Sequence, residues 1–318
     1  MNNVLRISNF KQQKPVITNV FANYMDEAWS DNTSKALRQA WSVFERHCTT
    51  CSVETLPASV QTVSEYINRR SKVVHRNTLK ADVWAISRVH TMNGMEDPTK
   101  SQIVRDTLRA ANRSKVRGEE KITQANGIEW ETLKGVIGEL TNSDKVIDVR
   151  DAAIFATTYA GFLRSNELLG IKMKHLSLDH VNPHIILPFT KTNHSGDADV
   201  VAIPQSVVEV LKKWISVREE TQDEEEYLFT SVNRYNKSNL HKRGLKYQAI
   251  LSVFKKHSVD EQEWTTHSCR VGAAQRAIKS GMQTNVVMKM GRWKKESQML
   301  SYAQGYQLDN TEISKLMQ

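Results

Sequence analysis

The chain has 318 residues, 39% hydrophobic and 25% charged, a composition typical of a folded globular protein with room for two domains. Its 44 lysines and arginines against 35 acidic residues give a net charge of +9, which favours a polyanionic partner such as nucleic acid. No apolar run approaches the ~20 residues of a membrane span, and Met1-Asn2-Asn3-Val4 does not begin a secretory signal, so we expect a cytoplasmic protein.

The cysteines are few and odd in number, which fits a reducing compartment. The string His47-Cys48-x-x-Cys51 has the spacing of half a zinc site, but two further ligands at suitable spacing are not evident. The end of a helix explains this string equally well. We therefore expect neither a metal nor another cofactor.

The N-terminal part of the chain is predicted to contain only helices. After a polar tail over residues 1–16, apolar residues recur at helical spacing, and the first strong helix directs Ala36, Ala40, Trp41 and Phe44 inward. Stripes of this kind pack as a helical bundle over residues 17–113, with helices over 33–47, 59–67, 77–92 and 100–113. Residues 114–127 begin with a polar stretch without an apolar stripe, which is typical of an interdomain linker.

Residues 128–318 are predicted to form a second, mixed domain. Helices are expected over 130–140 and 144–159, followed by a short segment that carries Arg164 between two glycines. Apolar runs that contain β-branched residues predict strands over 184–189 and 199–203, joined by a turn that contains Gly196. The expected fold class is therefore mainly α with a small antiparallel β-sheet. Further helices carry Val207, Val210, Leu211 and Trp214, then Ile250 to Phe254, and then Val271, Ala274 and Ile278.

Several residues in this second domain suit attack on a phosphodiester. The transition state places extra negative charge on the non-bridging oxygens, and arginine guanidinium groups match that geometry without losing their charge. Arg164 and Arg270 supply two such groups. Glu167, three residues after Arg164, can orient that arginine or a neighbouring histidine. His267 precedes Arg270 by the same spacing in a helix capped by Thr265 or Thr266.

A tyrosine completes the set. The phenol of Tyr302 can act as a nucleophile and form a covalent intermediate, and Lys191 on the predicted hairpin can protonate the poor leaving oxygen. Taken singly, each residue has an ordinary explanation: a solvated helix face, a helix cap, a core Trp293 or a surface tyrosine. Their order along one chain favours the catalytic interpretation.

This order of residues resembles the active site of the tyrosine recombinases, the phage integrase family, in its Cre-like branch. The resemblance is strongest from about Val149 to Tyr302 and implies catalytic roles for Arg164, Glu167, Lys191, His267, Arg270, Trp293 and Tyr302. One departure is Arg292, because the Cre-like pattern has a glycine before the tryptophan. We expect Arg292 to add a phosphate contact without altering the chemistry.

The resemblance also implies a partner and an assembly. Two domains would form a C-shaped clamp on double-stranded DNA in a bacterial or phage host cell, and cleave it through a 3′-phosphotyrosine. Two recombinase-bound duplexes would meet in a homotetramer and exchange strands through a Holliday junction. A C-terminal helix over residues 309–317 would insert into a neighbouring protomer, and docking on its own domain is the alternative. Basic and amide side chains near helix starts are candidate DNA contacts: Lys35, Arg38, Arg76, Asn77, Lys80, Lys242, Arg243, Lys246, Gln248 and Arg292.

Other functions remain open at this point. A type IB topoisomerase or a telomere resolvase would use the same phosphotyrosine chemistry. A DNA-binding protein without catalysis belongs to a different class, but binding alone does not require Tyr302 and Lys191 together.

Overall fold

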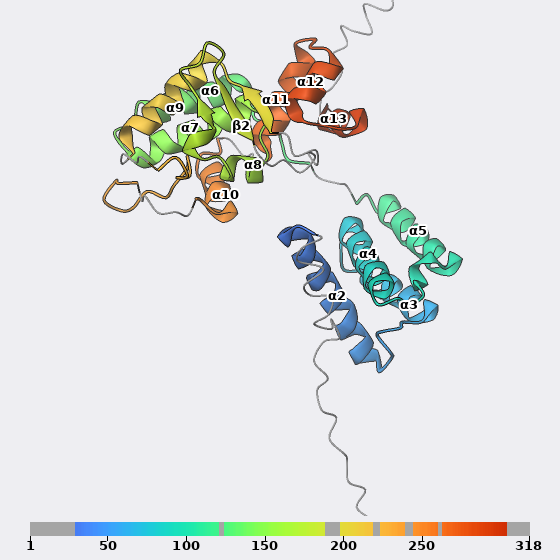
Figure 1. Ribbon diagram of the computed structural model, residues 1–318. Coiled ribbons are helices and arrows are strands. Elements are labelled where there is room, and N and C mark those ends of the chain that lie inside the picture. Colours follow the sequence, from blue (N-terminus) through green and yellow to red (C-terminus); the bar gives the residue numbers. More distant parts are fainter. Residues whose placement is uncertain are drawn as a thin grey trace, which may run out of the picture. The chain divides into compact units, whose positions relative to one another are not determined.

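The computed structural model describes residues 29–120, 124–187, 198–218, 223–238, 244–259 and 263–303. Contacts along the chain divide it into two compact units, Met1–Ile122 and Thr123–Gln318, which are coloured blue to green and green to red in Figure 1. None of the helices in the described part of the chain has the length and apolarity needed to cross a membrane.

The first unit is a helical bundle, as the sequence predicts. Helix α2 packs against α4, and α3 packs against α5, with a core centred on Trp41, Phe44 and Tyr66. Serine caps begin two of the helices, since the Ser30 and Ser59 hydroxyls accept hydrogen bonds from backbone N–H groups. The helices are α2 (Asp31–Cys51), α3 (Val60–Arg70), α4 (Arg76–Met92) and α5 (Gln102–Arg117), with a 3₁₀ turn at Pro98–Lys100.

Two details of this unit differ from the expected pattern. Ala36 was expected in the core but is exposed, and Leu37 is buried instead, with 1% of its surface exposed. The apolar stripe of α2 therefore consists of Leu37, Ala40, Trp41 and Phe44. Helix α5 continues to Arg117, into the stretch expected as linker. Glu120 holds this end of α5 to its own unit, since it binds Lys115 Nζ at 2.7 Å and the backbone N–H of Arg76 at 2.9 Å.

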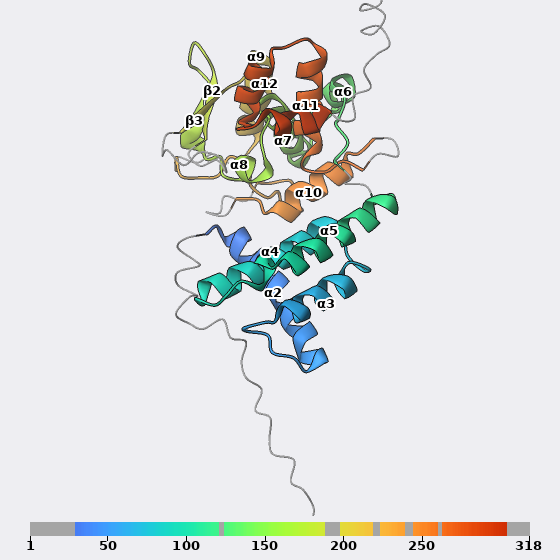
Figure 2. The same ribbon diagram turned by 90° about the vertical axis from the view of Figure 1, so that its right-hand side faces the viewer.

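The second unit is built around α7 (Val146–Ala160). Nearly every residue of α7 from Val149 onward is buried, as expected for a helix enclosed on all sides. It packs against α6 (Trp130–Thr141), α9 (Gln205–Val217) and α11 (Ser268–Lys279). The remaining helices are α8 (Ser165–Leu169), α10 (Tyr247–Lys256), α12 (Thr284–Gly291) and α13 (Glu296–Ala303). Figure 1 shows α12 and α13 beside α11, and all three are in mutual contact. Figure 2 gives a second view of α11 and α12.

A small antiparallel sheet covers another part of this core, which confirms the predicted strands. Strand β2 (His184–Leu187) lies between β1 (Leu176–Ser177), which the sequence did not indicate, and β3 (Asp199–Ala202). Ile185 pairs with Val201, and both side chains are buried. The turn expected at Gly196 and the predicted Lys191 lie outside the described residues.

Helix α11 contacts the start of the second unit through a glycine. A Cβ atom on Gly272 would lie 2.1 Å from the carbonyl oxygen of Ile128, and the Ile128 N–H donates to Ser268 O at 3.2 Å. Backbone atoms on both sides leave no flexible side chain to move aside. Only glycine therefore fits at position 272 in this arrangement.

We predict that Gly272→Ala lowers the free energy of unfolding by about 1 to 3 kcal/mol, the usual cost of overpacking. The matched control is Gly138→Ala, because Gly138 lies inside α6 with nothing within 4 Å of the added Cβ. That substitution should leave stability unchanged or raise it by up to about 1 kcal/mol. Thermal and urea unfolding of both variants check the prediction, and equal effects of the two would contradict it.

Candidate active site

Arg164 and Glu167 form a local unit at the start of α8. Arg164 is the N-cap residue, and its backbone N–H donates to Glu167 Oε2 at 2.8 Å. Its Nη1 donates to Glu167 Oε1 at 2.7 Å. The arginine side chain keeps 20% of its surface exposed while the Glu167 side chain keeps 3%. The predicted pairing of these two residues is thus confirmed, and the guanidinium retains an open side.

Arg270 lies in the first turn of α11 and is fully enclosed, at 0% exposure. Its Nη1 donates to the carbonyl of Phe162, and its Nη2 donates to the carbonyl of Gly291. Its Nε has no hydrogen-bond partner among the described residues. Burial, and then the positive charge of Arg164, lower the pKa of Arg270 to about 10, so the guanidinium still carries its charge at neutral pH.

Two aromatic rings cover this guanidinium. The Arg270 Cζ atom lies 4.4 Å from the ring centroid of Trp293 and 6.0 Å from that of Tyr302, within the range of a cation–π contact. The Trp293 and Tyr302 centroids are 5.1 Å apart. Gly291 permits the approach of the tryptophan, because a Cβ atom there would lie 1.8 Å from Trp293 Cζ3. Gln275 on α11 fixes the backbone of α13 by donating to the carbonyl of Tyr302 at 3.2 Å.

His267 lies one position outside the helix that was expected to carry it. Helix α11 begins at Ser268 and His267 is its N-cap residue, because the Thr265 hydroxyl already accepts the His267 N–H at 3.2 Å. The residue is exposed. Desolvation, followed by the positive charges of Arg270 and Arg164, lowers the pKa of His267, which favours a neutral imidazole.

Arg292 is directed into the protein, and its side chain is only 8% exposed. It was expected at a DNA phosphate, but in this structure its Nη2 donates to Glu167 Oε2 at 2.9 Å and to the Phe162 carbonyl at 3.0 Å. The Arg292 carbonyl in turn accepts from Arg164 Nη2 at 3.3 Å. No periodicity in the sequence indicates this contact, because 125 residues separate Arg292 from Glu167.

The other candidate DNA contacts are surface residues at helix starts. Lys35 and Arg38 are exposed on α2, Asn77 and Lys80 are exposed in the first turns of α4, and Arg76 beside them is half-buried. Lys246 and Gln248 are exposed at the start of α10. Lys242, Arg243 and the expected helix 309–317 lie outside the described residues.

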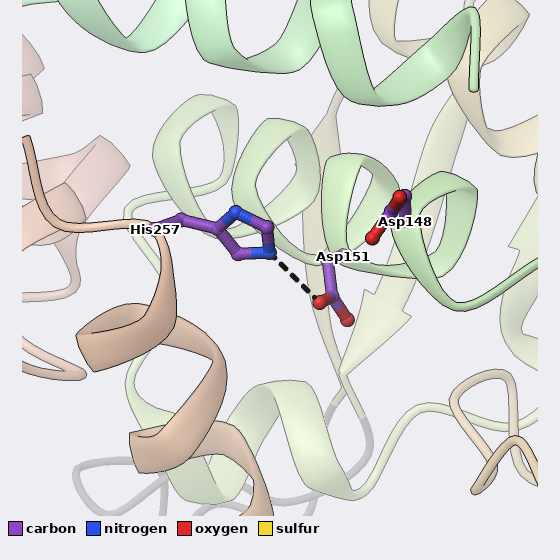
Figure 3. Close-up of side chains that lie close together, drawn as sticks. All are labelled: Asp148, Asp151 and His257. Carbon is purple, nitrogen blue, oxygen red and sulfur yellow. Dashed lines mark hydrogen bonds and ion pairs between the residues drawn. The ribbon is translucent and has the colours of Figure 1, made fainter. Parts of the chain in front are cut away.

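A second cluster of ionisable groups, which the sequence did not reveal, joins α7 to α10 (Figure 3). Asp151 Oδ2 lies 3.0 Å from His257 Nε2. Asp148 lies close to both and is on α7 with Asp151, whereas His257 is the C-cap residue of α10. Cationic side chains already contact these carboxylates, since Arg150 binds Asp151 at 2.7 Å and Lys256 binds Asp148 at 3.0 Å. The protein itself therefore balances the charge of this cluster, which fastens two helices of the core.

Comparison with known proteins agrees with this geometry. Residues 133–307, more than half of the chain, match the phage integrase family. The chain belongs to that family. It is accordingly a tyrosine recombinase, an enzyme that cleaves and rejoins DNA at specific sites.

Individual relatives cover most of the chain. The integrase/recombinase XerD homolog of Selenomonas ruminantium is 28% identical over 294 residues, which cover 87% of this chain and 83% of the relative. The Cre recombinase of Escherichia phage P1 is 24% identical over 340 residues, 100% of this chain and 99% of the relative, which is compatible with a Cre-like branch.

Solved structures share the fold of this chain at low sequence identity. The Tn1549 transposon integrase in complex with transposon right end DNA is 12% identical, with a TM-score of 0.63 over 94% of this chain and 95% of that chain. A lambda integrase dimer bound to a COC' core site is 14% identical, with a TM-score of 0.61 over 91% and 95% of the two chains.

We predict that Trp293→Ala destabilises the second unit by about 3 to 5 kcal/mol, because the buried ring contacts both Arg270 and Tyr302. Trp293→Phe keeps an aromatic face over the guanidinium and should cost less than half as much. Thermal unfolding and DNA cleavage by the two variants check this order. A Phe variant as impaired as the Ala variant would contradict the importance of the aromatic contact.

Proposed function

We propose that this recombinase cleaves DNA through a covalent 3′-phosphotyrosine on Tyr302. The observation that carries the proposal is the convergence of two guanidinium groups and a phenol at the ends of α8, α11 and α13. Arg164 and Arg270 donate to the adjacent carbonyls of Arg292 and Gly291, and Arg270 lies under the ring of Tyr302. Two charges that repel each other and lie this close favour an anionic ligand between or beside them.

The proposed reaction is a transesterification. Tyr302 Oη releases its proton to solvent and attacks the scissile phosphorus, and the bond from phosphorus to the 5′ oxygen breaks as the phosphotyrosine bond forms. Arg164 and Arg270 neutralise the charge on the non-bridging oxygens, and His267 donates a hydrogen bond to one of them. Lys191 gives a proton to the departing 5′ oxygen. Attack by a 5′ hydroxyl of the partner strand reverses the steps, so the phosphodiester energy is conserved and no nucleotide cofactor is consumed.

DNA binding must rearrange the site before this step. Arg270 is fully enclosed here, so a phosphate reaches it only after neighbouring side chains move aside. The half-buried Tyr302, whose ring centroid lies 6.0 Å from the guanidinium carbon, is the neighbour that also has to reach the phosphorus. Movement of α13 would expose Arg270 and bring Tyr302 to the phosphorus in one step.

We further infer that the enzyme works as a homotetramer on two compact sites and exchanges strands through a Holliday junction. The segment 309–317 carries Ile313, Leu316 and Met317 on one expected helix face, and a helix so short requires a surface on which to dock. Val286 and Met290 on α12 are large apolar residues that stay 41% and 38% exposed. A neighbouring protomer's C-terminal segment would cover such a surface.

The nucleophile is tested by Tyr302→Phe, with Tyr306→Phe as the matched control. The probe is a duplex selected from a random-sequence pool by binding to this protein. Removing one phenolic oxygen should leave binding intact and abolish the detergent-resistant protein–DNA adduct, which Tyr306→Phe should still form. An adduct with the Tyr302 variant but none with the Tyr306 variant would refute the assignment.

The general acid is tested with Lys191→Ala on two versions of that duplex. The variant should cleave normal DNA slowly but recover on DNA with sulfur at the bridging 5′ position, because a thiolate leaves without a proton. Arg270→Ala should show no such selective recovery. Equal defects of the lysine variant on the oxygen and sulfur substrates would assign Lys191 to binding.

Assembly is tested by truncation after Gln307. If residues 309–317 dock on a neighbour, the truncated chain should bind a single half-site with nearly unchanged affinity but form no synaptic tetramer and no recombinant product. Native gels and light scattering on DNA distinguish the two outcomes. Tetramer formation like that of the full chain would exclude the proposed exchange.

A further inference from the structure

Arg292 occupies a backbone conformation that suits glycine. Its φ is +54° and its ψ is 45°, in the left-handed region at the C-cap of α12. A residue with a side chain is less stable there than glycine by roughly 1 to 2 kcal/mol. The chain nevertheless carries an arginine at this position, directly before Trp293, and its side chain makes contacts that offset the strain.

The guanidinium of Arg292 joins two loops of the active site. Its Nη2 lies within hydrogen-bond distance of Glu167 Oε2 at 2.9 Å and of the carbonyls of Phe162 and Gly161 at 3.0 and 3.1 Å. Its Nη1 donates to the carbonyl of Met290 at 3.0 Å, in the last turn of α12. These contacts connect the end of α12 to the turn between α7 and α8.

Arg164 shares the same carboxylate. Glu167 Oε2 accepts from the Arg164 backbone N–H at 2.8 Å, and Oε1 accepts from its Nη1 at 2.7 Å. Arg164 also contacts Arg292 directly, because its Nη2 donates to the Arg292 carbonyl at 3.3 Å. The hydrogen bonds among Arg164, Glu167 and Arg292 therefore form a closed ring. Both the backbone and the side chain of Arg164 are therefore held by groups that Arg292 contacts.

We propose that Arg292 is a positioning residue of the cleavage site, which holds Glu167 and the backbone of residues 161–162 and thereby orients Arg164 toward the scissile phosphate. The inference rests on the proposed function. A direct phosphate contact fits the geometry less well, because the Arg292 side chain is 8% exposed and is engaged by acceptors of the protein, whereas Arg164 is 20% exposed.

Electrostatics support the same role. Burial raises the pKa of Glu167, but the positive charge of Arg292, followed by the hydrogen bond and charge of Arg164, outweighs burial and holds the pKa below its usual value. Arg270 on α11 is the third cation that acts on this carboxylate. Without Arg292 the pKa of Glu167 rises, so its charged form is lost at a higher pH as the solution is acidified.

The test compares Arg292→Gly, which relieves the backbone strain and removes the guanidinium, with Arg292→Lys, which keeps the charge but not the forked contacts. The substrate is the selected duplex at saturating concentration, and the readouts are single-turnover cleavage rate, dissociation constant and pH profile. For Arg292→Gly we expect a rate loss of about tenfold or more, as for one charged hydrogen bond, with affinity nearly unchanged. The acid limb of the profile should move to higher pH, and Arg292→Lys should restore part of the shift.

Two further variants complete the design. Lys294→Gln removes a neighbouring exposed charge and should leave both the rate at saturation and the acid limb unchanged. Glu167→Gln removes the carboxylate charge that Arg292 contacts. Arg292→Gly should therefore slow cleavage by a smaller factor in the Glu167→Gln background than in the unaltered enzyme. If Arg292→Gly fails to fold, the comparison of Arg292→Lys with Glu167→Gln carries the test through the acid limb.

An unchanged rate and acid limb in Arg292→Gly would overturn the inference, and so would a defect confined to affinity, which would make Arg292 a phosphate contact. These outcomes are distinct from failure of the proposed function. In that case the unaltered protein itself would form no phosphotyrosine adduct with the same duplex.

Discussion

The candidate active site depends on keeping the guanidinium of Arg270 charged inside the protein. Transfer of an unpaired charge into a dry interior is very costly, so every such group needs close polar partners. Arg270 receives two backbone carbonyls and the face of Trp293 instead of a carboxylate of its own. Partial compensation of this kind leaves a net positive charge, which is the property that an anionic phosphate requires.

The surrounding fold supplies those partners from distant parts of the chain. The Phe162 carbonyl comes from the turn after α7, and the Gly291 carbonyl comes from the end of α12. The Phe162 carbonyl is held because α7 is enclosed in the core. Arg270 itself is held because α11 lies close to the Ile128 backbone, which only Gly272 permits. Packing far from the phosphate therefore determines where the arginine points. Stability and the proposed catalysis therefore depend on the same helix.

Local patterns in the sequence predicted the parts of this arrangement that depend on local structure. The helices of the first unit and the paired strands follow from apolar periodicity, and the Arg164–Glu167 ion pair follows from spacing within one short segment. The inward direction of Arg292 and the cluster of Asp151 with His257 were not predictable in this way. Each joins residues more than a hundred positions apart, and such contacts are decided by tertiary packing. Lys191 and the segment 309–317 remain predictions from the sequence and the family.

We propose that Arg164 and Arg270 stabilise negative charge on the scissile phosphate. The most direct test of this proposal is the cleavage of a duplex whose scissile phosphate is replaced by a neutral methylphosphonate, with the unaltered enzyme and the Arg164→Ala and Arg270→Ala variants. With one charge removed from the substrate, the arginine variants should lose much less of their rate relative to the unaltered enzyme than they lose on normal DNA. Equal losses on the charged and the neutral substrates would contradict this account of the site.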